Sequence, residues 1–244
     1  MTAGFSPITL AEMDSIRLMD RTDTKFVTDL ARLETFLEAA RERGYRALEV
    51  EGHMVCGYDT VYYDTPGLEM YLDHHNRRLV RQKVRVRTYR DTGVSFLEIK
   101  KKDNHGRTKK KRLQCATDDV FGAGRDSFLT DRTGYRPSDI RPVLRTGFER
   151  ITLVNPDLTE RLTIDMGLQF ENLTGGGTAS LAGIAIMELK RDGRADRTTP
   201  DMLALSGIRR FKISKYCIGT AMTSPDVKQN RFKEKIRQIE KFSI

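Results

Sequence analysis

The sequence of 244 residues has few of the features that mark secreted and membrane proteins. Its three cysteines, Cys56, Cys115 and Cys217, stand far apart and form no C-x-x-C pair. This predicts buried thiols in a reducing compartment rather than a disulfide framework. No apolar run approaches membrane-spanning length, and the N-terminus lacks the charged and apolar segments of a signal peptide. We therefore expect a cytoplasmic protein.

Positive charge is unevenly distributed along the chain. There are 43 Lys and Arg residues against 34 Asp and Glu, which gives a net charge of +9. Between Arg77 and Arg112, however, the sequence has 15 Lys or Arg and only 3 Asp or Glu. The net charge of this segment is therefore larger than that of the whole chain. A surplus of cations confined in this way predicts a specific anion-binding region rather than a generally basic surface.

Apolar residues recur with period two over most of the chain, which is typical of β-strands. Strands are expected at 21–27, 55–63, 79–90, 94–102, 108–115, 143–154, 160–166 and 183–190, with a further one near 168–172. Short connections such as DTG at 91–93 favour antiparallel pairing. About eight strands are in the range that closes into a small barrel. We predict an α+β fold: a closed eight-stranded antiparallel β-barrel with helices packed outside.

Helical spacing is confined to the regions that flank these strands. A helix is expected at 29–43, capped by Thr28 or Asp29 and ended by Gly44. Towards the C-terminus the pattern predicts a short helix from Pro200, a second at 211–222 and a basic amphipathic helix through 226–242. We expect a single domain over 1–244, with its core at about 20–220 and a C-terminal basic helix at 224–244.

Each predicted strand carries charges on one face and apolar side chains on the other, because side chains alternate along a strand. Arg85 and Arg87 thus share a face with Lys83, opposite two valines. The other charged-face residues are Arg21, Asp23, Lys25, Arg81, Glu98, Lys100, Lys102, Lys110, Arg112, Arg161, Asp165, Glu188 and Lys190. Lys101, Lys109 and Lys111 have the opposite, outward parity.

Two interpretations of this charged face are open. Exposure to solvent explains any single strand, but cations side by side on several strands repel one another. If the charges point inward, the barrel becomes a cationic tunnel suited to phosphate oxygens. The carboxylates within it are then counter-charges or ligands of a divalent metal. For Asp165 an ion pair and a metal site are equally compatible with the pattern.

Seven motifs resemble, in the same order, those of the VTC-type polyphosphate polymerase domain, a branch of the CYTH or triphosphate tunnel metalloenzyme superfamily. They are YDTVYYDTP (58–66), KVRVRTY (83–89), FLEIKKK (96–102), GRTKKKRL (106–113), ERLTID (160–165), IMELK (186–190) and ISKY (213–216). The resemblance spans about residues 20–220 and is more specific than any single motif. It implies an eight-stranded tunnel that binds triphosphate or polyphosphate together with Mn or Mg.

The resemblance also assigns roles to residues. Phosphate binding is expected of Lys25, Arg85, Arg87, Lys100, Lys110, Arg161, Ser214 and Lys215, to which the strand alternation adds Arg112 and Lys190. The residues expected to be catalytic are Lys25, Arg85, Arg87, Lys100, Arg161 and Glu188. Glu188 is the expected metal ligand, with Glu98 and Asp165 as further candidates. The role of Lys215 follows from the resemblance alone, because this residue falls on a predicted helix, where strand alternation does not apply.

One departure from the superfamily bears on activity. Many CYTH triphosphatases begin with E-x-E-x-K, whereas the aligned stretch runs from Arg21 through Asp23 to Lys25. We expect an ATP- or NTP-dependent polyphosphate polymerase that transfers a terminal phosphoryl group to a phosphate chain. A triphosphatase of the same fold and a non-catalytic polyphosphate-binding module are the alternatives. Binding of specific nucleic acid is not expected, because few aromatic residues are interleaved with the cations. A membrane-bound partner and the oligomeric state are left open.

Several conspicuous residues have simpler interpretations. Tyr58, Tyr62 and Tyr63 are expected to be packing residues, since aromatics at strand spacing usually are. His74 and His75 have no metal-ligand spacing and are expected in a polar loop. The C-terminal basic helix is expected to cap the fold rather than to bind a partner.

Overall fold

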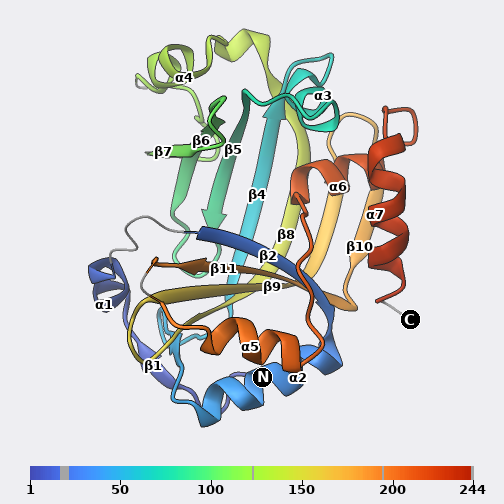
Figure 1. The fold of residues 1–244 in the computed structure, drawn as a ribbon. Coiled ribbons are helices and arrows are strands. Elements are labelled where there is room, and N and C mark those ends of the chain that lie inside the picture. The colour runs from blue at the N-terminus through green and yellow to red at the C-terminus, as the bar shows by residue number, and fades with distance from the viewer. Residues whose placement is uncertain (17–21, 123, 194, 243–244) are drawn as a thin grey trace.

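The structure, a computed structural model, describes residues 1–16, 22–122, 124–193 and 195–242. Eight strands pair in one path (Figure 1). In the order of pairing they are β2 (Thr22–Asp29), β11 (Ile184–Arg191), β9 (Glu160–Asn172), β8 (Arg141–Val154), β4 (Cys56–Asp64), β5 (Arg81–Tyr89), β6 (Ser95–Lys102) and β7 (Thr108–Cys115). All neighbours on this path are antiparallel. The α+β class and the strand positions are therefore confirmed.

Three short strands extend the sheet. They are β1 (Ser6–Ile8), β3 (Arg46–Leu48) and β10 (Thr178–Leu181). Strand β3 pairs with β8 and β10 pairs with β9, whereas β1 and β3 are parallel to each other. The segments predicted at 160–166 and 168–172 are one long strand, β9, which continues through Gly167.

The long pair β8 and β9 bends the sheet into two arms. Their register shifts between Gly147 and Glu149, opposite Gly167, which has a φ of +60° that favours glycine. Beyond this bulge β2, β11 and β9 cross in front of the other strands instead of lying flat beside them (Figure 1). The bend thus brings the two ends of the sheet to the same side.

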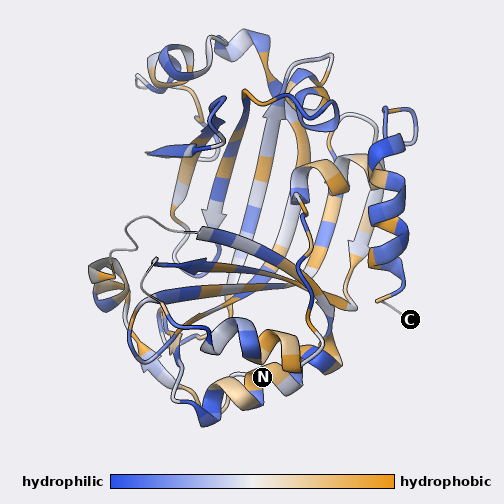
Figure 2. Ribbon diagram, in the orientation of Figure 1, coloured by the Kyte–Doolittle hydropathy of each residue, from blue (hydrophilic) through white to orange (hydrophobic). Residues whose placement is uncertain are grey.

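The sheet is not closed by hydrogen bonds, so the expected closed barrel is not formed by backbone pairing. Within the described residues β2 and β7 are the two ends of the path and do not pair with each other. Residues 108–114 of β7 are all exposed, and four of them in succession, 109–112, are basic. Figure 2 shows this strand as hydrophilic over most of its length.

The helices of the described residues are α1 (Leu10–Ser15), α2 (Leu30–Glu42), α3 (Glu69–His75), α4 (Arg125–Thr133), α5 (Thr198–Leu205), α6 (Lys215–Thr223) and α7 (Asn230–Glu240), with a 3-10 turn at Pro137–Asp139. Helix α2 confirms its prediction: Asp29 accepts a hydrogen bond from the Arg32 backbone, and Gly44 follows the end with a φ of +70°. No helix among the described residues is long and apolar enough to span a membrane.

Three expectations about helices need correction. His74 and His75 lie on α3 rather than in a loop. The C-terminal helix α7 begins at Asn230, not at 224–226, because side chains hold the preceding turn: Tyr71 donates to the Lys228 carbonyl and Asn172 donates to Ser224. Residues 211–213 precede α6 in extended form, where the Phe211 amide donates to the carbonyl of Lys25 on β2.

Apolar clusters cover the outer face of both arms. Helices α2 and α5 pack through Leu33, Phe36 and Leu203 on the arm of β2, β11 and β9. On the other arm Leu129 of α4 packs with Val84 and other apolar residues of β5 and β6. Helix α6 differs from the prediction that helices lie only outside. Its Tyr216 stacks on Tyr62, which pairs with Arg85 and so lies on the charged face.

Candidate functional site

The charged face predicted from alternation is present. Val84 and Val86 are buried in the outer cluster, whereas Arg85 and Arg87 point to the opposite face and are also buried. Register places Lys83, Lys100 and Lys110 in one cross-strand row. The next row along these three strands contains Arg85, Glu98 and Arg112, and the third contains Arg87, Phe96 and Gln114.

Glu98 is enclosed by cations. Its Oε2 accepts from Arg85 Nε at 2.8 Å and its Oε1 accepts from Lys110 Nζ at 3.1 Å. Its side chain is only 1% exposed. Burial alone would raise the pKa of Glu98, but Arg85, Arg87 and Lys110 together hold it well below its usual range. Glu98 is therefore a permanent negative charge that holds two neighbouring cations in place.

Glu188 lies on the other arm and is more open to solvent. Its Oε2 lies 3.7 Å from Lys25 Nζ, and its Oε1 accepts from Lys190. Lys190 Nζ also lies 3.4 Å from a carboxylate oxygen of Asp23. Burial would raise the pKa of Glu188, but Lys25 and Lys190 hold it well below its usual range. Its side chain is 25% exposed, so its oxygens can exchange partners more easily than those of Glu98.

Asp165 forms a third cluster with α6. Arg150 donates to its two oxygens at 2.6 and 2.9 Å, and Lys215 of α6 donates to one of them. Burial would raise the pKa of Asp165, but Arg150 and Lys215 hold it far below its usual range. The geometry thus favours the ion-pair interpretation of Asp165 over the metal interpretation.

The N-terminus of α6 contacts both arms. Ser214 caps this helix and accepts a hydrogen bond from Lys83 Nζ of β5 at 2.8 Å. Lys25 of β2 donates to the Ile213 carbonyl at 3.2 Å. Asp64, at the end of β4, accepts from the Tyr216 hydroxyl and from the backbone of Met70 and Tyr71. These bonds fix Ser214 and Lys215 over the charged face and explain the aspartate in the YDTVYYDTP motif.

Aromatic rings border the cations at one end of this face. Tyr58 stacks on Phe148 at 5.3 Å, with the guanidinium carbon of Arg150 4.8 Å from the Tyr58 centroid. Lys215 Nζ lies 3.9 Å from the Phe148 centroid. Arg87 lies 5.5 Å from the Tyr58 centroid, and its Nε is buried without a hydrogen-bond partner in the described residues. Tyr58 and Tyr62 are packing residues, as expected, and Tyr58 also supports cations.

Lys100 shows how strongly the cations oppose one another. It has no hydrogen bond or ion pair within the part of the chain that the structure describes. Arg85 and burial lower its pKa to about 6, an effect that Glu188 on the opposite arm partly offsets. Burial, together with Lys25, Arg85 and Arg81, lowers the pKa of Lys83 to about 8. Charges that disturb one another in this way favour an anionic ligand, which would stabilise the protonated lysines.

The structure brings most of the predicted residues together, since Lys25, Glu188 and Lys190 face Lys83 and Lys100 across the bend. Arg112 lies at the rim, 4.6 Å from the Phe96 ring, and Arg161 donates to the Met13 carbonyl at 3.0 Å. Arg21 lies outside the described residues. Sequence reasoning placed Lys83 on the charged face without a binding role, and it did not assign Arg150 or His74 to the site. Burial, followed by Lys83 and Arg81, lowers the pKa of His74 to about 2, which places this neutral imidazole beside the cations.

The donor set at Glu188 fits a divalent cation that bridges protein and substrate. No group of three His, Cys, Asp or Glu side chains in the described ranges could hold a metal by itself. Mg²⁺, however, usually takes one or two carboxylates and completes its shell with water and substrate phosphates. Glu188 and Asp23, which share the Lys190 ammonium, meet that requirement. Glu98 and Asp165 are instead almost fully buried, and each carboxylate is paired with two cations.

A profile of the VTC domain matches residues 20–224. The chain belongs to the VTC domain family. This confirms the resemblance carried by the seven motifs. No curated protein sequence gives a significant match to this VTC domain chain.

Solved structures are similar to this VTC domain at low sequence identity. HpAC1 from Hippeastrum, described as a candidate adenylyl cyclase with a dominant triphosphatase activity, is 13% identical over 83% of this chain and 96% of its own, with a TM-score of 0.55. A candidate adenylate cyclase from Vibrio parahaemolyticus is 12% identical over 80% of this chain and 97% of its own, with a TM-score of 0.48. At such identities the likeness concerns the fold alone.

Proposed function

We propose that this VTC domain binds ATP or another NTP on its charged face and transfers the terminal phosphoryl group to a polyphosphate chain. The observation that carries the proposal is the excess of cations over acids on that face. Glu98, Asp165 and Glu188 are each shared by two cations, and Arg87, Lys83 and Lys100 make no ion pair within the described residues. Polyanionic ligands on both sides of the reacting phosphorus would supply the missing negative charge.

Each cluster has a distinct role in the proposed reaction. Arg85, Arg87, Lys100 and Lys110 would bind the phosphates from β5 to β7, while Lys25, Arg161 and Lys190 would bind them from the opposite arm. Ser214 and Lys215 would add the N-terminus of α6, whose amides favour an anion. Arg112 would contact phosphate at the rim. Glu188, with Asp23 beside it, would hold a divalent metal such as Mn or Mg, which would neutralise charge on the transferred group.

The proposed transfer needs no protein nucleophile. A terminal oxygen of the acceptor chain forms the new bond to the γ-phosphorus, and the bond to the β,γ-bridging oxygen breaks with its electron pair, which leaves on ADP. Lys25, Lys100 and the arginines keep the two phosphate groups in line and stabilise the charge that develops between them. Positioning and electrostatics therefore account for the catalysis, and no group on the protein has to accept a proton.

A closed tunnel forms part of the same proposal. A phosphate chain lying between Lys110 on β7 and Lys25 on β2 would attract a cation from each edge. The open sheet would then close around its ligand. Amide hydrogen exchange of β7 with and without tripolyphosphate measures this directly.

Hydrolysis is the second candidate, because HpAC1, which shares the fold, is described with a dominant triphosphatase activity. The two reactions differ only in the acceptor, which is a phosphate chain or water. The arrangement of the acids favours the chain: Glu98, Asp165 and Glu188 all have pKa values held well below the usual range, so none is a good base for activating water.

Incubation with ATP and Mn or Mg, followed by separation of the products by chain length, tests the proposal. We expect polyphosphate chains that grow with time. ATP should be consumed, and the ADP formed should equal the phosphate added to the chains. Free phosphate without longer chains would assign hydrolysis instead. Tight binding of tripolyphosphate without either product would assign a binding module. Glu188→Gln serves as the inactive reference in each assay.

A further inference from the structure

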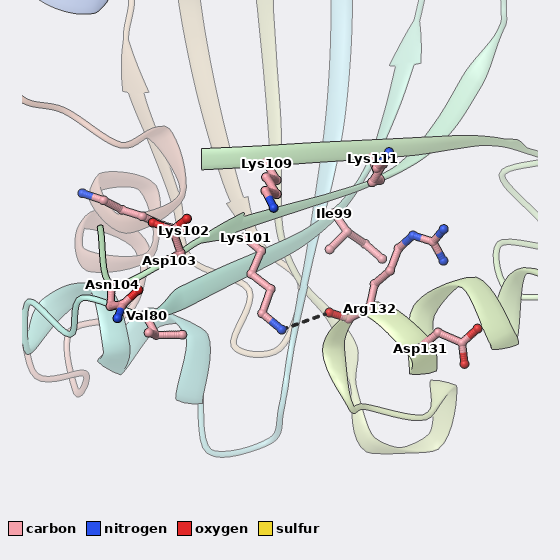
Figure 3. Close-up of a pocket in the computed structure, with 10 residues that line it drawn as sticks. All are labelled: Val80, Ile99, Lys101, Lys102, Asp103, Asn104, Lys109, Lys111, Asp131 and Arg132. Atoms are coloured by element: carbon pink, nitrogen blue, oxygen red, sulfur yellow. Dashed lines mark hydrogen bonds between the residues drawn. The ribbon is translucent and has the colours of Figure 1, made fainter. Parts of the chain in front are cut away.

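A second cationic cavity lies behind the charged face, on the outer side of β6 and β7 (Figure 3). It encloses about 620 Å³ between these strands and α4. Lys101, Lys109 and Lys111 line it together with Arg132 of α4, above a floor that includes Ile99 and Val80. We call this cavity the outer groove. These lysines are the three whose parity pointed away from the charged face.

The outer groove has a fixed shape. Lys101 Nζ donates to the Arg132 carbonyl at 3.4 Å, and Gln82 of β5 donates to the Thr133 carbonyl at 3.1 Å. Both bonds attach α4 to the sheet, and Leu129 of the same helix is fully buried against it. These contacts hold α4 against the sheet as one wall of the groove.

The cations of the outer groove crowd one another, and none of its lysines on β6 and β7 forms an ion pair within the described residues. Lys101 and Lys109 are directly opposite each other across β6 and β7, where side-chain Cβ atoms are only about 5 Å apart. Lys109 and Lys111 form no ion pair in the described part of the chain. Asp103 and Asp131 also line the groove, but the Asp103 carboxylate accepts from the Arg107 backbone. Five cations, Lys101, Lys102, Lys109, Lys111 and Arg132, line the groove against these two acids, and this surplus favours an anionic occupant.

A continuous row of cations connects the outer groove to the charged face. Lys102 follows Lys100 on the charged-face side of β6, yet it also lines the outer groove at the end of the strand. Its charge acts on His74 together with Lys83 and Lys25, so it lies near the end of the charged face. A phosphate chain that passes Lys100 thus meets Lys102 and then the outer lysines on crossing the β6–β7 hairpin.

We propose that the outer groove binds a second stretch of the same polyphosphate chain after it leaves the charged face. This rests on the proposed polyphosphate ligand but not on its being polymerised here. Charge complementarity supports a phosphate chain, since its dense charge matches lysines spaced two residues apart on adjacent strands. A short phosphate such as tripolyphosphate would occupy the charged face alone. The outer groove would therefore select for chain length.

Direct binding without nucleotide or metal tests this. The triple variant Lys101→Gln, Lys109→Gln, Lys111→Gln is compared with the wild type for tripolyphosphate and for long-chain polyphosphate by calorimetry. The affinity for the long chain is expected to fall roughly tenfold, and the salt dependence to lose about two units of slope, because three phosphate contacts disappear. Tripolyphosphate affinity is expected to stay within about twofold, since no charged-face lysine is changed.

The matched control removes the same charge elsewhere. Arg231, Lys233 and Arg237 are exposed on α7, and their replacement by Gln should leave the affinity for long chains unchanged. An equal loss in this control, no loss in the outer-groove variant, or an equal loss for tripolyphosphate would overturn the proposal. Thermal unfolding of each variant verifies that the fold is retained.

Two further comparisons distinguish this proposal from binding of an acidic protein segment and from the proposed transferase function. Polyglutamate of matched charge is expected to compete weakly; competition as strong as that of polyphosphate would assign the outer groove to an acidic protein segment and overturn the proposal. If the wild type makes no polymer from ATP, the proposed transferase function fails, but the binding result still decides the role of the outer groove.

Discussion

Glu98 and Glu188 are two carboxylates that each pair with two cations but differ in their burial. Each contacts two cations on the charged face, and each has its pKa held low by them. Glu98, however, is 1% exposed beside a buried arginine, whereas Glu188 is 25% exposed between two lysines. The same charge pattern can therefore serve structure at one position and exchangeable ligand binding at the other, and burial distinguishes them.

The largest expected effect is on catalysis at Glu188. Glu188→Gln should lower metal-dependent turnover of ATP by at least about a hundredfold, because a metal position and its charge are lost. The free energy of unfolding should change by less than about 1 kcal/mol, since partly exposed ion pairs contribute little. Product analysis and urea unfolding measure the two effects. Wild-type turnover in this variant would remove Glu188 from the proposed site.

Substitution of Glu98, unlike that of Glu188, should have a large effect on the free energy of unfolding. Glu98→Gln leaves Arg85 buried without its counter-charge, which should lower the free energy of unfolding by about 3 kcal/mol. Because the folded pKa of Glu98 lies below the unfolded value, its contribution is complete above about pH 4.3 and is lost as the pH falls further. Urea unfolding between pH 3 and 7 should thus show a smaller acid loss in the variant. Equal stability of the two proteins at pH 7 would contradict the structural role.

A smaller effect concerns the lysine row that faces both carboxylates. The pKa of Lys83 is about 8, lowered by burial and then by Lys25, Arg85 and Arg81, so its proton is lost between pH 7 and 9. An anion binds the protonated form, and tripolyphosphate affinity should therefore fall by roughly tenfold as the pH rises from 7 to 9. Calorimetry in buffers of different ionisation enthalpy measures the accompanying proton uptake. Lys83→Arg keeps its charge and should flatten the profile; a profile as steep as that of the wild type would exclude Lys83 as its source.

The smallest expected effect distinguishes the open edge of the sheet from its interior. Tripolyphosphate should slow amide exchange in β7, at the open edge, by several-fold, and should leave β5, paired on both sides, nearly unchanged. Hydrogen exchange resolved by mass spectrometry reports both strands in one experiment. Equal protection of both would mean general stabilisation rather than closure of the edge.

The charged face was predictable from sequence because it depends on local alternation alone. Val84 and Arg85 are assigned to opposite sides by parity, whatever the rest of the chain does. The pair of Arg150 and Asp165 was not assigned, although the hairpin between β8 and β9 contains the signal. Once Val154 is paired with Arg161, counting back along each strand sets Arg150 opposite Asp165. Alternation within one strand does not give the register between β8 and β9, and this register is what pairs Arg150 with Asp165.

The position of α6 could not be predicted in this way. Its sequence indicates a helix, but only tertiary packing decides that Tyr216 stacks on Tyr62 and donates to Asp64, and hence that Lys215 reaches Asp165. Closure of the sheet could not be predicted from local sequence either. Strand number permits a barrel, but the bend between the two arms, which depends on the register shift in β8 and β9, decides how the edges β2 and β7 lie.

The exposed edge of β7 has one more consequence. A sheet edge with unpaired backbone groups is a template for strand addition by another molecule, and lysines on such an edge prevent it. The basic run 109–112 therefore also protects an open sheet against aggregation. The basic side chains proposed to bind phosphate would thus also keep other strands away from the open edge.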